Sequence, residues 1–394
     1  MRQAVDPLVE FLREEAAGGL ALLAATILAL AWANSPLGDE YVALWEHELR
    51  VGAGSLALTL DLRHWVNDGL MALFFFVVGL EIKRELVTGE LREPRAAALP
   101  AIAALGGVLL PAGIFLALTT GGEGAAGWAI PTATDIAFAV GLVTLLGDRV
   151  SPGVRLFLLT IAIVDDIVAI AVIAVFYATD LSPAWLAAGA AALGAVVVAR
   201  RLGVTRIAPY VLIGLVAWAA IHRSGVHATI AGVALGLLTP ARAVGGRAVL
   251  RTLEHRLHPV SAFLVVPLFA LANAGVDLGG GVLGDALASR LTWAIVAALV
   301  VGKLAGVAGA TMLGLWSGAG RLPGDVARRD VLGVAAVAGV GFTVSLFIAQ
   351  LAFDDPALVD RAKVGIFLGS AISGALGVAV LVALARRAPA RGAR

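Results

Sequence analysis

The chain has 394 residues, of which 60% are hydrophobic and only 14% are charged. Soluble domains carry about 25% charged residues, so this composition indicates a polytopic membrane protein. The net charge of +1 argues against a nucleic-acid-binding surface. The absence of cysteine excludes disulfides, thiol catalysis and cysteine-based metal sites.

Hydropathy predicts an all-α membrane protein with about twelve transmembrane helices. We expect residues 1–394 to form one transmembrane domain, whose core is built from the spans at about 96–177 and 291–388 and whose scaffold is built from the others. The first span is expected to be retained, because the acids before it are unlike the n-region of a signal peptide. The expected spans are 16–34, 62–82, 96–118, 126–146, 154–177, 183–199, 207–222, 226–239, 259–274, 291–315, 330–352 and 358–385.

The basic residues test this number of spans. If the N-terminus is cytoplasmic, most of the 29 lysine and arginine residues fall in cytoplasmic segments, and Lys303 lies within the tenth span. Cytoplasmic loops carry the excess of positive charge in membrane proteins, so the bias predicts that both termini are cytoplasmic. The basic residues expected on the outer side are Arg50, Arg63, Arg223, Arg290, Arg361 and Lys363.

The longest outer loop is expected at about 35–61. Near its end, leucines at every second position from Leu56 to Leu62 predict a β-strand. An exposed hairpin edge pairs readily with a second copy, so this loop is a candidate homodimer contact. The alternative is a loop that lies on the membrane surface.

Several ionisable residues lie at the expected ends of spans. Glu81 and Glu85 end the second span on the cytoplasmic side, and Glu254 lies near the start of the ninth. These positions are typical of a solvated entrance funnel or of pH-sensing groups. His227 begins a helix on the outer side, where it either responds to external pH or hydrogen-bonds a loop.

The centre of the fourth span contains Pro131, Thr132, Thr134 and Asp135. Proline removes a backbone donor and clashes with the preceding turn. Irregular backbone at membrane depth is tolerated only where it is buried in protein or lines a cavity. The pattern therefore predicts a broken helix whose freed backbone groups and Asp135 bind a ligand, with a simple proline kink as the alternative.

Two adjacent carboxylates, Asp165 and Asp166, lie in the middle of the fifth span. Ionisable residues within a membrane are costly and usually functional. A carboxylate pair can hold protons, a hard cation, or each in turn. The alternative is a buried structural pair.

Two later spans carry matching signals. Gly339, Gly341 and Thr343 interrupt the eleventh span, and paired interruptions in two halves of a chain indicate a transporter's binding site. Spans three to five and ten to twelve would then form inverted repeats. In the tenth span, Lys303 lies beside a face of small residues that allows close helix packing. The acids of the fifth span are its expected counter-charge, unless the lysine extends to an interface.

These segments together resemble the NhaA-type sodium/proton antiporter family, and the resemblance runs through nearly the whole chain. The segments that carry it are Thr134-Asp135-Ile136-Ala137-Phe138-Ala139, Ile163-Val164-Asp165-Asp166, Gly79-Leu80-Glu81-Ile82-Lys83-Arg84-Glu85, Ser224-Gly225-Val226-His227-Ala228-Thr229, and Leu253-Glu254-His255 with His258-Pro259.

The resemblance implies twelve spans in the inner membrane, with the fourth and eleventh broken and crossing at the midplane. It implies exchange of Na⁺ or Li⁺ for H⁺ at Asp166 and Asp165, no cofactor, and a dimer through the outer hairpin. Further roles are implied for three sets of residues. Lys303 would pair with Asp165, Asp135 and Lys303 would offset helix dipoles, and Glu81, Glu85 and Glu254 would form a pH-responsive entrance. The family usually has proline after this lysine, where this chain has Leu304.

Two other functions compete with this interpretation. An intramembrane aspartyl protease needs acids on facing helices, and neighbours such as Asp165 and Asp166 cannot meet this requirement unless Asp135 is the second acid. A sodium-coupled symporter of an organic solute requires a roomier cavity than an Ala/Gly-rich centre provides. We therefore predict a transporter and not an enzyme.

Overall fold

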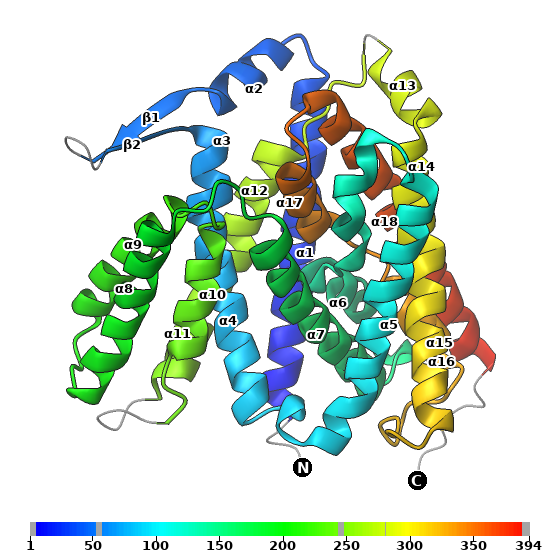
Figure 1. Cartoon of the computed structure of the whole chain (residues 1–394). Helices are drawn as coiled ribbons and strands as arrows, with labels where there is room; N and C mark the ends of the chain where they lie inside the picture. The colour runs from blue at the N-terminus through cyan, green and yellow to red at the C-terminus, as the bar shows by residue number, and fades with distance from the viewer. Residues whose placement is uncertain (1–4, 53–56, 243–247, 280, 388–394) are drawn as a thin grey trace. The chain divides into compact units, whose positions relative to one another are not determined.

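The computed structural model describes residues 5–52, 57–242, 248–279 and 281–387, and only the backbone of residues 5–15, 123, 148 and 387. Figure 1 shows that the described residues form helices and one β-hairpin. The chain divides into two compact units. The first unit comprises Met1–Ala21, Glu90–Ala169 and Leu278–Arg394, and the second comprises Leu22–Gly89 and Ile170–Asp277. Helices α1 (Val5–Ala33) and α7 (Pro152–Phe176) contribute to both.

Helices are the only regular secondary structure among the described residues of the first unit. Its longest elements are α5 (Pro94–Thr119), α7 and α18 (Pro356–Arg387). The helix that bears Lys303 is continuous but contains a wide π-helical turn. The remaining elements are η4 (Glu90–Arg92), η5 (Glu123–Thr132), α6 (Ile136–Leu145), η6 (Gly147–Arg149), α13 (Val282–Ala288), α14 (Arg290–Ala297), the π-turn η8 (Ala298–Gly302), α15 (Lys303–Trp316), α16 (Asp330–Val337) and α17 (Phe342–Ala352).

Two helix pairs in the first unit are broken. The 3₁₀ helix η5 meets α6 at an angle of 42°, and α16 meets α17 at the same angle. The first break comprises Ala133–Asp135, and Pro131 itself remains within the 3₁₀ helix. The two breaks lie against each other, because the Asp135 N–H donates to the Val340 carbonyl over 2.7 Å.

Glycines bring α5 and α15 into backbone contact. A Cβ atom added to Gly106 would lie 2.3 Å from the Gly306 carbonyl oxygen, and one added to Gly306 would lie 2.2 Å from the Gly106 carbonyl oxygen. Neither position can therefore accept a side chain without separating the two helices. The small-residue face predicted beside Lys303 is confirmed, and its partner is α5.

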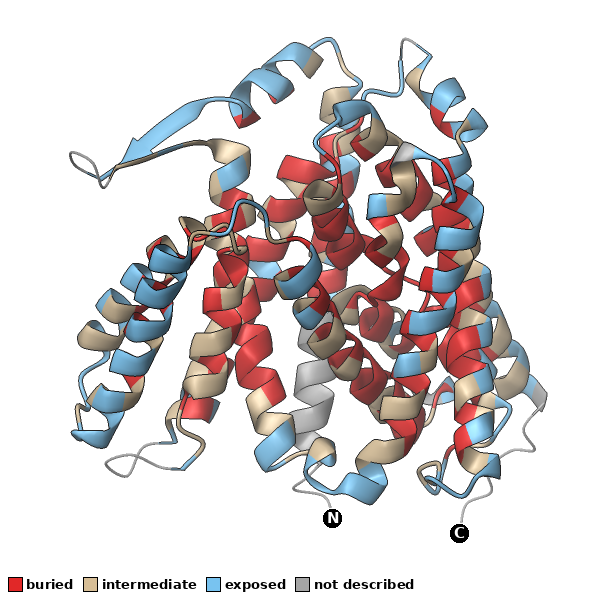
Figure 2. Cartoon of the chain, in the orientation of Figure 1, coloured by how far each residue is buried: buried red, intermediate tan, exposed pale blue. Residues whose placement is uncertain are grey.

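The second unit contains helices and one β-hairpin. Helices α4 and α10 are largely buried (Figure 2) and touch through glycines, because a Cβ on Gly232 would lie 2.1 Å from the Ala72 carbonyl oxygen. The elements are α2 (Gly38–Trp45), β1 (Glu48–Val51), β2 (Leu58–Asp61), α3 (Leu62–His64), the π-turn η3 (Trp65–Leu70), α4 (Met71–Val87), α8 (Pro183–Arg201), α9 (Ile207–His222), α10 (Thr229–Leu238), α11 (Val249–Val260), the π-turn η7 (Ser261–Val265) and α12 (Val266–Asn273).

The expected hairpin is present. Strands β1 and β2 pair in antiparallel register, with Glu48 opposite Asp61. The strand ends at Asp61 because its carboxylate accepts a hydrogen bond from the His64 N–H and caps α3, so Leu62 is helical. Leu56, the first leucine of the predicted alternation, lies outside the described residues.

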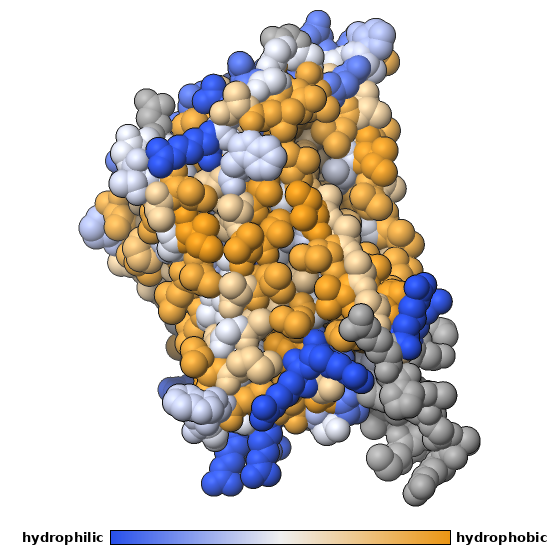
Figure 3. Space-filling model, turned by 90° about the vertical axis from the view of Figure 1, so that its right-hand side faces the viewer, coloured by the Kyte–Doolittle hydropathy of each residue, from blue (hydrophilic) through white to orange (hydrophobic). Residues whose placement is uncertain are grey.

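The apolar helices confirm a multi-pass membrane protein. Within the described residues, seven helices are long and apolar enough to cross a membrane, or up to nine if each bent pair is one span. Figure 3 shows a face on which apolar side chains form a broad band and hydrophilic ones collect at its ends. On α5 and α15, the exposed apolar residues include Leu109, Leu313 and Trp316.

Each expected span contains a helix or a run of joined helices, and the first and the ninth begin well before their expected starts. Helix α1 begins at Val5, eleven residues before 16. The ninth run begins at Val249, ten residues before the predicted start at 259. Its first helix buries Leu250, Glu254 and His258, which are four residues apart and share a face. Charged residues on the opposite face lower the mean hydropathy and hid this start from the sequence analysis.

Candidate ion-binding site

The predicted lysine and aspartate meet in the first unit. Lys303 begins α15 after the wide turn, and its ammonium Nζ lies 2.6 Å from Asp165 Oδ2 on α7. Both side chains are fully buried. Leu304, at the position where the family usually has proline, therefore leaves this pairing intact. Removing either partner would leave an uncompensated charge in the protein interior.

Lys303 also binds the first broken helix. Its Nζ donates to the Thr132 carbonyl over 2.7 Å and to Thr134 Oγ1 over 3.1 Å. Thr132 is the last residue of η5, so the ammonium lies at a helix C-terminus, where the helix dipole favours positive charge. The Thr134 hydroxyl lies 2.7 Å from Asp165 Oδ2 and 2.8 Å from the carbonyl of Ala338, at the end of α16.

Asp135 occupies the opposite helix ends. Its Oδ1 accepts a hydrogen bond from the Phe138 N–H over 2.9 Å, which caps α6. Its Oδ2 accepts one from the Thr343 N–H over 3.0 Å and another from the Thr343 hydroxyl, at the start of α17. One carboxylate therefore caps two half-helices at their positive ends. Capping occupies both oxygens, which argues against Asp135 as the second acid of a protease.

Asp165 keeps one oxygen available. Among the described residues, its buried Oδ1 atom has no hydrogen-bond partner. Asp166 follows on the same helix and is 5% exposed. Carboxylate, hydroxyl and carbonyl oxygens are the ligands that hard cations such as Na⁺ prefer. The donor set of Asp165, Asp166, Thr134 and the backbone of the breaks therefore suits a small cation.

The sequence identified most of this arrangement but missed two of its residues. The structure bonds Thr134, Asp165 and Lys303 to one another. Asp135 lies at the adjoining helix ends, and Asp166 follows Asp165 in α7. The sequence analysis did not assign Ser345, whose hydroxyl donates to the Ile130 carbonyl over 2.6 Å, or the Ala338 carbonyl. A polar serine within an otherwise apolar predicted span was the sequence signal for Ser345.

A family model for Na⁺/H⁺ antiporter 1 matches residues 9–381. The chain belongs to this family. Curated relatives agree: an antiporter NhaA 2 of Erythrobacter litoralis is 46% identical, with 98% of this chain and 96% of the relative aligned. An NhaA 3 of Frankia alni is 45% identical over 98% of this chain and 90% of its own length. An NhaA of Anaeromyxobacter is 47% identical over 96% of this chain and 91% of its own length.

The acids that the family resemblance assigns to an entrance lie together in the second unit. Arg84, in the last turn of α4, pairs with Glu85 at 3.0 Å and with Glu254 of α11. One turn earlier, Glu81 Oε1 lies 3.9 Å from His258 Nε2. Three carboxylates, one guanidinium and one imidazole therefore form a single charged cluster at this end of α4.

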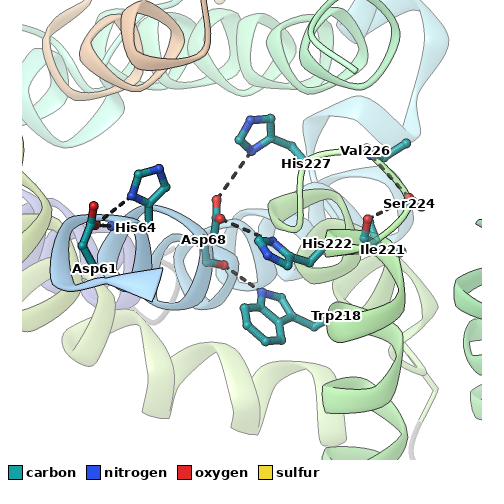
Figure 4. Close-up of polar contacts among 9 residues, drawn as sticks. All are labelled: Asp61, His64, Asp68, Trp218, Ile221, His222, Ser224, Val226 and His227. Atoms are coloured by element: carbon teal, nitrogen blue, oxygen red, sulfur yellow. Dashed lines mark hydrogen bonds and ion pairs between the residues drawn. The ribbon is translucent and has the colours of Figure 1, made fainter. Parts of the chain in front are cut away.

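His227 belongs to a different cluster in the second unit. Its Nδ1 lies 3.8 Å from Asp68 Oδ1, while His222 Nδ1 lies 3.4 Å from Asp68 Oδ2 (Figure 4). The Trp218 indole stacks on the His222 ring and donates to the Asp68 carbonyl over 2.8 Å. Loss of water around the imidazole lowers the pKa of His227, Asp68 raises it, and His222 lowers it. The structure places His227 in a buried cluster, within 4 Å of an acidic side chain.

Proposed function

We propose that this protein exchanges Na⁺ or Li⁺ for H⁺ across the cytoplasmic membrane. The observation that carries the proposal is the fully buried Asp165, bonded to Lys303 where two broken helices meet, with Asp166 beside it on α7. The names of the curated relatives, Na⁺/H⁺ antiporters at about 45% identity, support the same activity. Transport of this kind requires no covalent chemistry and no cofactor.

Competition between protons and cations explains the exchange. When Asp166 and Asp165 are protonated, the site has no negative charge to hold Na⁺, and when they ionise the cation can bind. A site that alternately faces each side and holds either protons or a cation exchanges the two. Lys303 and Asp135 neutralise the helix ends at the crossing, so binding changes the charge of the aspartates alone.

We infer a topology of twelve spans with both termini in the cytoplasm and with inverted repeats. The short helices α9 and α10 and the run α3–η3–α4 would add to the spans that length and composition identify. The first unit would be the transport core and the second the scaffold, within one transporter domain. The bias in basic residues supports this orientation.

We also infer that pH regulates transport. The cluster of Glu81, Glu85 and Glu254 around Arg84 supports a cytoplasmic entrance whose charge changes with pH. His227, which lies beside Asp68, would respond at the opposite end. Protonation of one of these carboxylates would release Arg84 from it, and this change of partner would couple pH to activation.

We further propose a homodimer through the 35–61 loop. Every residue of β1 is exposed, and Leu49 and Val51 are 44% and 50% exposed. An exposed apolar strand edge pairs readily with a second copy. Deleting residues 38–60 should weaken self-association and leave transport measurable, whereas loss of all transport in correctly inserted protein would contradict this role.

The transport assay is a pH-gradient dequenching measurement in proteoliposomes, with Na⁺, Li⁺ and K⁺ added in turn. We expect Na⁺ and Li⁺ to drive proton movement and K⁺ to have little effect, because the oxygen ligands lie among small, closely packed residues. Equal responses to all three cations, or none at any pH from mildly acidic to alkaline, would overturn the proposed function.

A further inference from the structure

The beginning of the carboxylate-bearing helix α7 is held by a residue from elsewhere in the first unit. Asp325 lies between α15 and α16, and its Oδ2 accepts a hydrogen bond from the Gly153 N–H over 2.9 Å. The Asp325 carbonyl lies 3.4 Å from the Ser151 hydroxyl. The first turn of a helix has N–H groups without partners in the helix, and Asp325 satisfies one of them from a distant segment.

The fit at this contact is tight. A Cβ added to Gly153 would lie 1.9 Å from Asp325 Oδ1 and 2.7 Å from its Cγ. Alanine is a better helix former than glycine, so helix formation alone does not favour glycine at this position. A Cβ at this position would instead displace the Asp325 carboxylate from the N–H group that it caps.

The segment that carries Asp325 is itself anchored. Val326 is 8% exposed, and its N–H donates to the Pro323 carbonyl over 2.9 Å. The next N–H, that of Ala327, donates to the carboxylate of Asp330, the first residue of α16. The contact with Gly153 therefore connects α7 to the start of α16.

This contact and the Lys303–Asp165 pair connect the same two parts of the chain, α7 and the segment from α15 to α16. The segment leads back through α15 to Lys303, which binds Asp165 on α7. Asp165 lies about 18 Å along α7 from Gly153, at 1.5 Å per residue. Because a helix is stiff along its axis, a shift at Gly153 displaces Asp165 relative to Lys303.

We propose that Asp325 is a positioning residue that sets the axial register of α7 against α15, and thereby the Lys303–Asp165 pair. The proposal rests on the proposed antiport, because its consequence is expressed in cation binding. The register depends on the Asp325 carboxylate and on the space that the glycine at position 153 leaves for it. Substitutions at the two positions should therefore have coupled effects.

A double-mutant cycle of Asp325→Ala and Gly153→Ala in purified full-length protein tests this pairing. In each single variant, the apparent KM for Na⁺ should rise about fivefold, the equivalent of a lost helix cap, while kcat changes less. In the Asp325→Ala background, Gly153→Ala should cost nothing further and should raise the thermal unfolding midpoint, because alanine then favours the helix without a clash. Asp325→Asn, which keeps an acceptor oxygen, should have a KM for Na⁺ close to that of the wild type.

A matched control is Asp355→Ala, which removes a local cap from α18, where Asp355 Oδ1 accepts from the Ala357 N–H. It should leave the KM for Na⁺ unchanged. Additive effects of the two substitutions on unfolding, or a wild-type KM in Asp325→Ala, would overturn the positioning role. Failure of the wild-type protein to exchange Na⁺ would overturn the proposed function instead, while the unfolding cycle still tests the contact.

Discussion

Lys303 and Asp165 share a 2.6 Å hydrogen bond between two fully buried groups, while the second oxygen of the aspartate has no hydrogen-bond partner among the described residues. The lysine therefore fixes the carboxylate without occupying it. The Asp165 carboxylate is thereby held in place, and its second oxygen is left to coordinate a cation.

Replacing Lys303 with alanine should lower the free energy of unfolding by about 3 to 5 kcal/mol, because the Asp165 charge is left buried without its partner. Combining Lys303→Ala with Asp165→Asn should recover part of this loss. Thermal unfolding in detergent measures both effects. Lys363→Ala is the control, because its partner Asp360 is 32% exposed and can be solvated after the substitution, so the loss should be smaller than for Lys303→Ala. Additive single effects would show that the two residues do not interact.

Replacing Asp166 with asparagine should abolish the release of protons upon Na⁺ binding, since asparagine keeps an acceptor oxygen but cannot ionise. Calorimetry in buffers of different protonation enthalpy counts the protons that Na⁺ displaces. Asp285→Asn, on the exposed surface of α13, is the control and should release protons as the wild type does. If Asp166→Asn still binds Na⁺ with normal proton release, the exchangeable site lies elsewhere.

Replacing Asp135 with alanine should destabilise the protein by about 2 kcal/mol, because the substitution removes the caps of α6 and α17 together. Asp135→Asn should cost less, since its one amide oxygen can still cap one helix. Chemical unfolding monitored by tryptophan fluorescence measures the difference. Asp61→Ala, which removes the cap of the short helix α3 and an exposed contact with the His64 ring, should have a smaller effect. Equal losses in Asp135→Ala and Asp61→Ala would argue against the double cap.

Because of His227, the free energy of unfolding should decrease as the pH falls below the ordinary histidine pKa. Burial lowers its pKa in the folded state from 6.5, so the unfolded chain takes up a proton that the folded protein resists. The contribution is complete above 6.5 and is lost as the pH falls through the lowered folded pKa. His227→Gln should flatten this decline, as measured by unfolding midpoints above and below 6.5. His64→Gln, at a side chain 61% exposed, should retain the wild-type slope, and an unchanged slope in His227→Gln would contradict the prediction.

The site could be predicted from sequence because its residues are costly in their surroundings. Few purely structural roles explain the ionisable residues of three apolar runs. These are an acid four residues after a proline, a pair of adjacent acids and a single lysine. The particular bonds were not predictable, since the contact between Asp135 and Thr343 depends on how two distant helices cross. Hydropathy likewise could not reveal the start of α11, whose amphipathic first turns have a polar face.

The double cap of Asp135 also affects when the backbone opens. The amides of Phe138 and Thr343 lie far apart in the sequence, yet they donate to the same carboxylate. Hydrogen exchange at an amide requires its bond to break, and bonds that share one acceptor group are released by the same displacement. The two amides should therefore exchange with a common rate, which would make the crossing of the broken helices one cooperative unit in the native ensemble.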